Sequence, residues 1–210
     1  GLKDDMTVVE LWAGSGWYTD LLAPVLHDKG KLRVTSFDNP KGELKDQADK
    51  LDQKLAHAPA IYGKVEVLRL TPPDKLALGP DGSADLVLTF RNFHNWMQDG
   101  IEDKVLAAAF KVLKPGGTLG VVEHRAHAGT DPKLAKDSGY VPEEFVVKMV
   151  EAAGFKLAAK AEINANPKDT KDHPGGVWSL PPSLMHGEKD ADIYKAIGES
   201  DRMTLKFTKP

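Results

Sequence analysis

The chain has 210 residues, of which 41% are hydrophobic and 28% are charged, a composition typical of one globular domain with its own core. The formal net charge of −3 gives no general attraction to polyphosphate or anionic lipid, and no basic stripe argues for a nucleic-acid partner. The absence of cysteine excludes disulfides, thiolate catalysis and Cys-containing metal sites. No apolar run approaches the roughly 20 residues that span a bilayer, so no membrane partner is expected.

The first half of the chain alternates β-branched runs with longer helical stretches, the pattern of a mostly parallel sheet. We predict strands at residues 7–12, 31–37, 64–70 and 85–90, and helices at about 17–27 and 41–57. A Gly-containing turn follows the first strand, and the turn signal at residues 79–82 precedes the fourth.

The second half continues the alternation and then departs from it. We predict helices at about 100–113 and 141–154, and strands at 118–123, 155–163 and 202–208. The first of these helices is expected to stop at Lys114-Pro-Gly-Gly117, because Pro and Gly do not extend it. Residues 164–200 are rich in Pro, Gly, Asn and Asp, with one short helix expected near 190–197. Long irregular segments inside a domain are usually lids or binding loops, so residues 1–210 are predicted to form a single domain with a lid-like insertion at about 164–200.

Three motifs occur in a characteristic order along this alternation. Glu10-Leu-Trp-Ala-Gly-Ser-Gly16 follows the first strand, Asp38 ends the second, and Lys111 to Glu123 reads as a helix, a Pro-Gly-Gly turn and a strand. Together with the final strand, these motifs resemble the class I S-adenosylmethionine (SAM) dependent methyltransferases from Thr7 to Thr208. The resemblance implies an α/β, Rossmann-like fold: a seven-stranded, mostly parallel sheet with an antiparallel last strand and helices on both faces.

The resemblance also implies SAM as the cofactor and assigns residues to it. Glu10 would lie near the methionine end, and Gly14 and Gly16 would lie against its backbone, since glycine allows close approach and positive φ. Asp38 would hold the ribose hydroxyls. The remaining candidates for the cofactor are Asp74 near the adenine, with Thr71 beside it, Arg91 after the fourth strand, and Trp12. Trp12 departs from the family, because it stands where the first glycine is expected and either reshapes the pocket or blocks it.

Polar side chains follow two predicted strands that end at the same edge of the sheet, where ligands of open α/β folds bind. Arg91-Asn-Phe-His-Asn-Trp96 follows the fourth strand and Glu123-His-Arg-Ala-His127 follows the fifth. We expect acceptor chemistry around Arg91, His94, Glu123 and His124, with His94 or His124 as a base that titrates near neutral pH. Arg91 or Arg125 would hold an acceptor carboxylate by a two-point contact.

Structural roles compete with these assignments. His94 could begin a helix and bond only to backbone, and His124 and Arg125 could pair with Glu123 in a structural network. The histidines and Glu123 have ligand chemistry that suits zinc, but the sequence fixes no geometry and no metal ligand is predicted. In the late segment, Trp178 and His173 fit either an ordered lid over a ligand or a surface crossover packed on the domain.

Methyl transfer from SAM to a small-molecule acceptor is the predicted function, because no appended domain for macromolecular recognition is visible. The alternatives are a methyltransferase fold with lost or changed SAM use, acting as a ligand-binding module, and a metal-assisted hydrolase that uses the histidines. The late segment and the Arg91–Trp96 run also resemble a bacterial group of predicted methyltransferases, some of which look exported. The chain begins at Gly1 rather than Met, so a removed leader would leave no trace. The compartment is therefore open: cytoplasmic if the protein uses SAM, with export as the alternative. The acceptor and the oligomeric state are not specified by the sequence.

Overall fold

The computed structural model describes residues 1–210 and contains one seven-stranded sheet with the strand order β3-β2-β1-β4-β5-β7-β6. Six strands are parallel and the last is antiparallel, with helices packed on the sheet, which confirms the Rossmann-like α/β fold expected from the sequence. The strands are β1 (Thr7–Leu11), β2 (Lys31–Phe37), β3 (Glu66–Leu70), β4 (Ala84–Phe90), β5 (Leu113–His124), β6 (Lys156–Ala161) and β7 (Arg202–Thr208). The helices are α1 (Thr19–Leu26), α2 (Glu43–His57), α3 (Pro59–Tyr62), α4 (Phe93–Asp99), α5 (Glu102–Val112), α6 (Ala135–Ser138), α7 (Glu143–Ala152) and α8 (Ala191–Ile197), with 3-10 turns η1 (Pro132–Leu134) and η2 (Gly176–Ser179).

The chain forms two compact units, each assembled from separate stretches of sequence. Unit 1 comprises Gly1–Thr89, Lys104–Gly120 and Thr208–Pro210, and unit 2 comprises Phe90–Asp103 and Val121–Phe207. No helix in either unit combines the length and the apolar character that crossing a bilayer requires.

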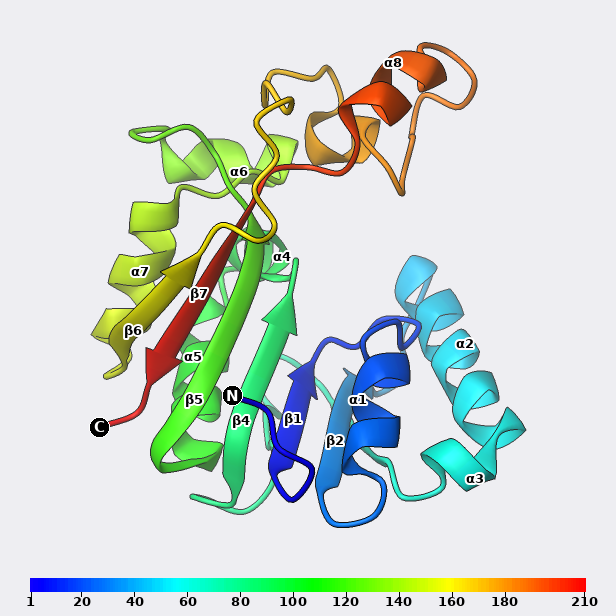
Figure 1. Ribbon diagram of the computed structural model, residues 1–210, viewed down its shortest axis with the longest axis vertical. Coiled ribbons are helices and arrows are strands. Elements are labelled where there is room, and N and C mark those ends of the chain that lie inside the picture. The colour runs from blue at the N-terminus through cyan, green and yellow to red at the C-terminus, as the bar shows by residue number, and fades with distance from the viewer. The chain divides into compact units, whose positions relative to one another are not determined.

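Unit 1 is built around the buried strand β1, which pairs in parallel with β2 on one side and β4 on the other. Val8 lies opposite Leu32 and Leu86 in these two ladders, and all three side chains are buried. Strands buried on both faces read as nearly continuous apolar runs, which is the pattern of residues 7–12. Helix α1 lies against β1 and β2 in Figure 1 and adds Leu22 and Leu26 to the same core.

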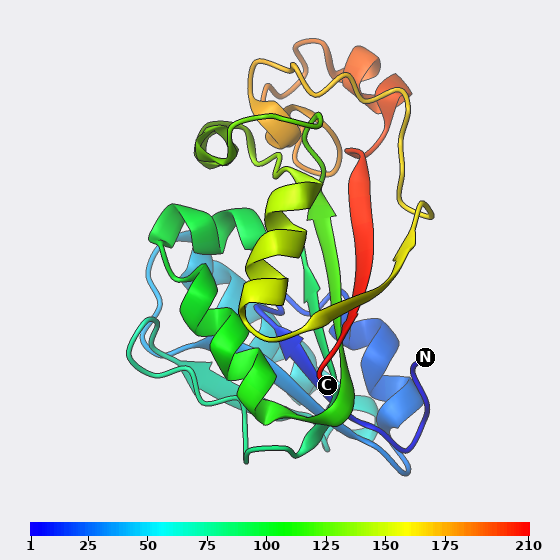
Figure 2. The ribbon, with the colours of Figure 1, turned by 90° about the vertical axis from the view of Figure 1, so that its left-hand side faces the viewer.

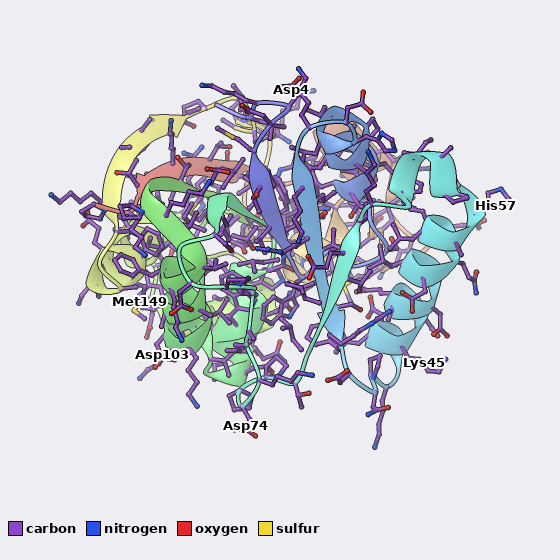
Figure 3. The ribbon with its side chains drawn as sticks, turned by 90° about the horizontal axis from the view of Figure 1, so that it is seen from below. Asp4, Lys45, His57, Asp74, Asp103 and Met149 are labelled. Atoms are coloured by element: carbon purple, nitrogen blue, oxygen red, sulfur yellow. The ribbon has the colours of Figure 1, made fainter.

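Helix α2 is amphipathic, as the sequence predicts. Leu51 and Ala48 are its buried residues, whereas the charged side chains around them remain largely in solvent. Figure 3 shows Lys45 and His57 near the two ends of this helix. Leu51 joins the core that β1, β2 and α1 form, so α2 is held on unit 1 by a narrow apolar stripe.

Unit 2 contains the end of β5 together with β6 and β7, and helix α7 lies alongside β6 (Figure 2). Burial alternates strictly along strand β7: Met203, Leu205 and Phe207 are buried between more exposed polar residues. This period of two follows from side chains that point to opposite faces of a strand.

Two local differences from the sequence predictions have physical causes. Strand β5 begins at Leu113 and runs through the Pro-Gly-Gly stretch that was expected to be only a turn. Gly116 adopts φ +77°, its N–H donates to the Lys209 carbonyl, and Lys209 in turn donates to Gly117, so pairing with the end of the chain extends the strand. Residues 93–99 form α4, a helix that the sequence offered only as an alternative role for His94, and its first backbone N–H groups are bonded by a distant carboxylate described below.

Candidate functional site

The loop after β1 keeps a left-handed backbone at each of its three motif positions. Trp12, Gly14 and Gly16 have φ values of +49°, +58° and +81°. Glycine adopts this region freely, whereas a side-chain-bearing residue is strained there. The tryptophan therefore occupies the position that favours glycine without changing the handedness of the loop, and helix α1 follows the loop directly.

The half-buried indole of Trp12 packs on the end of β2. Its ring centroid lies 5.5 Å from that of Phe37 in an edge-to-face arrangement, and its backbone N–H donates to Thr35 Oγ1 at 2.7 Å. Phe37 immediately precedes Asp38. Trp12 thus packs on the residue that precedes Asp38, the residue expected to hold ribose.

Glu10 is almost fully buried near the C-terminal end of β1, and its Oε2 accepts a hydrogen bond from Thr19 Oγ1 at 2.7 Å. Burial disfavours the charged carboxylate and raises the pKa of Glu10 to about 7. A carboxyl poised in this range responds strongly to a neighbouring cation, because an opposite charge favours its ionised form.

Asp38 follows β2 and is engaged through only one of its oxygens. Its Oδ2 accepts from Lys75 Nζ at 2.8 Å and from Thr71 Oγ1 at 3.2 Å, and the Lys75 hydrogen bond holds the pKa of Asp38 below its usual range. Oδ1 makes no hydrogen bond within the structure and can accept from a ribose hydroxyl. Asp74 is exposed in the next loop (Figure 3) and touches this group only through its backbone N–H, which donates to the Thr71 carbonyl.

Helix α2 closes over the glycine loop, a relationship that the sequence did not reveal. Lys54 Nζ donates to the Gly16 carbonyl at 2.9 Å and to Asp20 Oδ2 at 2.6 Å. A Cβ on Gly16 would lie 2.8 Å from the Leu51 side chain, so glycine is also required there for packing. In sequence, Lys54 is one of several lysines on a charged helix and carries no distinguishing signal.

In unit 2, Glu123 is the centre of the predicted acceptor cluster. Its buried carboxylate accepts four hydrogen bonds: from the Phe93 and His94 backbone N–H groups at 2.6 and 3.4 Å, from the His124 N–H at 2.8 Å, and from His94 Nδ1 at 3.0 Å. Burial alone would raise the pKa of Glu123, but the interactions with His94 and His124 outweigh it and lower that pKa. The carboxylate fixes the start of α4 against the end of β5.

The rings of the two histidines lie close together beside this carboxylate, with centroids 5.4 Å apart and planes tilted by 51°. An ionised carboxylate only accepts, so His94 Nδ1 carries a hydrogen, and the tautomer that this hydrogen bond selects has its lone pair at Nε2. His124 Nδ1 lies 2.5 Å from Ser200 Oγ, and burial lowers the pKa of His124 to about 3, which keeps its ring neutral. Neither Nε2 atom has a hydrogen-bond partner in the structure.

These three residues also satisfy the distance condition for a metal site, since one ligand atom from each lies within 4.8 Å of the others. The four donors around Glu123, however, already occupy the lone-pair directions of its two oxygens. The exposed His127, which completed the zinc set considered from sequence, is bonded instead to the Thr170 carbonyl. The arrangement therefore favours two imidazoles oriented by a carboxylate over a three-ligand cage.

The two arginines proposed as carboxylate clamps differ in the structure. Arg125 is occupied: its guanidinium contacts Asp201, Glu143 and Glu162 at distances of 2.6 to 3.3 Å. Arg91 adopts φ +59°, its N–H donates to the Val122 carbonyl, and its half-buried guanidinium forms no ion pair. Of the two, only Arg91 remains available to a ligand.

The late segment is anchored to unit 2 by a network that the sequence did not predict. Buried Asp169 accepts from Tyr140 Oη at 2.8 Å and contacts His173 Nε2 at 2.9 Å, and its other oxygen accepts from the Asp201 N–H. The ring of Trp178 lies edge-on to His94 with centroids 5.9 Å apart. Trp178 therefore contacts the predicted base, which is compatible with both a lid and a surface crossover packed on the domain.

An α/β fold with a left-handed glycine loop after β1, a buried acid in β1 and an acid after β2 is typical of a SAM-dependent methyltransferase. The unengaged Oδ1 of Asp38 suits the ribose of that cofactor, and the buried Glu10 suits its cationic end. A family profile described as "Methyltransferase domain" matches residues 9–121, more than half of the chain. The chain belongs to this family, its cofactor is S-adenosylmethionine, and the resemblance drawn from the sequence is confirmed.

Comparison with individual proteins agrees with this class. The chain is 30% identical over 151 residues to ribosomal RNA large subunit methyltransferase E of Nitrobacter winogradskyi, a match that covers 65% of this chain and only 59% of that relative. A SAM-dependent methyltransferase from Aquifex aeolicus shares the fold with a TM-score of 0.65 and 18% identity, over 100% of this chain and 85% of that one. The [4+2]-cyclase SpnF has the same TM-score at 17% identity, over 100% and 76% of the two chains.

Proposed function

We propose that the protein transfers the methyl group of SAM to a small-molecule acceptor whose proton is taken up by His94. The observation that carries this proposal is the buried pair of His94 Nδ1 and Glu123 Oε1, 3.0 Å apart. It fixes one tautomer and leaves Nε2 as a base in a site from which water is largely removed.

The bound cofactor supplies an electrophilic methyl group, and the chain supplies binding, orientation and a proton acceptor. Asp38 would bind the ribose through its free Oδ1, and Glu10 would face the cationic end of the cofactor. His94 would accept the proton of a hydroxyl or amine at Nε2, while Glu123 stabilises the imidazolium that forms. Glu123 is therefore a positioning residue, comparable to the carboxylate of a hydrolase triad.

A small acceptor is favoured over RNA by the charge of the chain. The net charge is −3, and several cations near the loops are neutralised internally, including Lys54 by Asp20, Lys75 by Asp38 and Lys171 by Asp201. Binding to a phosphate backbone depends on unpaired Lys and Arg. The ribosomal RNA methyltransferase among the relatives makes RNA the acceptor to test against.

Calorimetric titration with SAM and with S-adenosylhomocysteine tests the cofactor side. We expect saturable binding that Asp38→Ala weakens by about 10-fold or more, since hydrogen bonds to a charged group contribute roughly 1.5–3 kcal/mol. Lys45→Ala, an exposed change on α2, is the matched control. Saturable binding that Asp38→Ala leaves unchanged would contradict the assignment of Asp38.

Release of S-adenosylhomocysteine during an acceptor screen tests the chemistry. With a turned-over acceptor, His94→Ala should lower kcat by about 100-fold or more, the usual contribution of a general base, whereas His57→Ala on the exposed end of α2 should have no effect. Turnover by His94→Ala at the wild-type rate would refute the role of His94. Methylation of RNA fragments in preference to every small molecule would refute the acceptor class.

A second candidate is a methyltransferase fold that binds SAM and catalyses another reaction. Trp12 at a glycine position and the similarity to a [4+2]-cyclase favour it. If the indole narrows the cofactor site, Trp12→Gly should tighten SAM binding, and it should also relieve the strained φ. An unchanged or weaker affinity would show that Trp12 is compatible with the cofactor or supports it.

A further inference from the structure

We propose that the acceptor carries an anionic group, a carboxylate or a phosphate, which Arg91 and Arg202 bind beside the two histidines. This inference rests on the proposed function, since it names the chemical class of the molecule that receives the methyl group. All the residues that carry it lie in unit 2.

The first step is the geometry of the β5–β7 ladder. The Arg125 N–H donates to the Asp201 carbonyl at 2.9 Å, and their side chains form an ion pair on one face. Because side chains alternate along antiparallel strands, the neighbouring pair, His124 and Arg202, points to the other face. The bond between His124 Nδ1 and Ser200 Oγ lies on that second face.

The second step is the charge balance of unit 2. Three of its buried carboxylates are compensated by other groups: Glu123 by four donors, Asp169 by Tyr140, His173 and a backbone N–H, and Asp201 by Arg125 and Lys171. None of them pairs with Arg91 or Arg202. These carboxylates therefore do not neutralise either arginine.

The third step is the state of the two guanidinium groups. Arg91 forms no ion pair, and its left-handed backbone is a strained conformation of the kind that persists at ligand sites. Arg202 Nη1 pairs with the half-exposed Glu199, whereas its Nε is buried without a partner. A buried donor left without an acceptor is costly, and an anionic oxygen would satisfy it.

The neutral His124 ring agrees with this placement. Burial is the main reason that its pKa is lowered, the charge of Glu123 opposes the shift, and the charges of Arg91 and Arg202 add to it. The Arg91 N–H donates to the Val122 carbonyl, two residues before His124. A neutral His124 ring adds no cation beside the two arginines. A planar guanidinium binds carboxylate or phosphate through two parallel hydrogen bonds, and His94 Nε2 is available to the methyl-accepting atom of the same molecule.

The test uses anion binding to protein saturated with S-adenosylhomocysteine, so that the carboxylate of the cofactor cannot account for the result. Benzoate, phenyl phosphate and the neutral benzamide are titrated by ligand-observed NMR. We expect at least one of the two anions to bind about 10-fold or more tightly than benzamide, and the tighter anion identifies the group. Arg91→Gln and Arg202→Gln should each abolish this preference, whereas Arg69→Gln, in unit 1, should preserve it.

Arg91→Lys provides a second variant if a glutamine change unfolds the protein. It keeps the charge but lacks the two-point fork, so it should retain a reduced preference for the anion.

Equal binding of benzamide and both anions, or an undiminished preference in Arg91→Gln, would overturn the inference. Saturable cofactor binding with no anion preference refutes this inference alone. Absence of cofactor binding refutes the proposed function, and the same titrations on cofactor-free protein then decide the anion site separately.

Discussion

The imidazole of His94 and the carboxylate of Glu123 form a buried pair with 3.0 Å between Nδ1 and Oε1. The same carboxylate accepts the first backbone N–H groups of α4 and the N–H of His124 at the end of β5. One side chain therefore orients the base and fastens the two elements that carry the predicted acceptor cluster. Removing the carboxylate of Glu123 should therefore impair both the orientation of His94 and the attachment of α4 to β5.

Glu123→Gln should destabilise the protein by about 2–4 kcal/mol. The amide group of glutamine would face backbone donors in a buried site and leave at least one of them without an acceptor. Urea unfolding measures the loss. Glu144→Gln is the control, because Glu144 accepts the Gly129 N–H at the surface and should lose less than about 1 kcal/mol. Nitrogen NMR of the His94 ring should also show a changed tautomer balance in Glu123→Gln, which a purely structural role would not produce.

His124 should make the protein sensitive to acid. Its pKa is about 3 in the folded protein against an ordinary value of 6.5, so the unfolded chain binds more protons between these values and stability falls as the pH is lowered through 6.5. At pH 5 the loss from this residue should be about 2 kcal/mol. The difference in unfolding free energy between wild type and His124→Gln, measured at pH 7.5 and pH 5, isolates this contribution. A difference that is the same at both pH values would contradict it.

Glu10 should make the folded protein less stable as the pH rises. Its pKa is raised from 4.5 to about 7, so the folded protein binds the extra proton between these values and stability decreases as the pH rises through this range. Glu10→Gln preserves an acceptor for Thr19 and removes the charge, so it should gain up to about 3 kcal/mol over wild type at pH 8 relative to pH 4.5. A gain that does not depend on pH would indicate that Glu10 is not poised in this way.

The late segment should depend on a single glycine for its docking. A Cβ on Gly176 would lie 2.2 Å from the Ser138 carbonyl oxygen, and φ at this position is +56°. Gly176→Ala should therefore cost well over the roughly 1–2 kcal/mol expected for a left-handed alanine alone. Gly187 has a similar φ of +64° with open space around it, so Gly187→Ala should show only that backbone cost. Equal thermal shifts in the two variants would mean that η2 does not pack against α6 as described.

Local patterns in the sequence were sufficient to predict most of the fold, because β-branched runs, helix stops and acid positions are local features. The predicted strands all occur, and the cluster of His94, Glu123 and His124 was expected from strand ends alone. The extension of β5 through Pro115 could not be predicted, because it depends on pairing with Lys209 far along the chain. The hydrogen bond from Lys54 to the Gly16 carbonyl and the hydrogen bond from Tyr140 to Asp169 could not be predicted either. Those bonds follow from contacts between residues 29 to 38 positions apart, which no periodicity encodes.

The division of the chain has a consequence for its synthesis. Unit 1 includes Thr208–Pro210, and Lys209 Nζ donates to the carbonyls of Phe110 and Leu113 while its backbone pairs with Gly116 and Gly117. Translation proceeds from the N-terminus at about 5–20 residues per second, so unit 1 is not complete until residues 208–210 have been synthesised. Strands β1, β2 and β4 can pair with one another before then, but the Pro-Gly-Gly end of β5 has no partner until Lys209 is made. Loss of the contacts that Lys209 makes with Phe110, Leu113, Gly116 and Gly117 should therefore lower the folding yield in cells, although Lys209 lies far along the chain from all four residues.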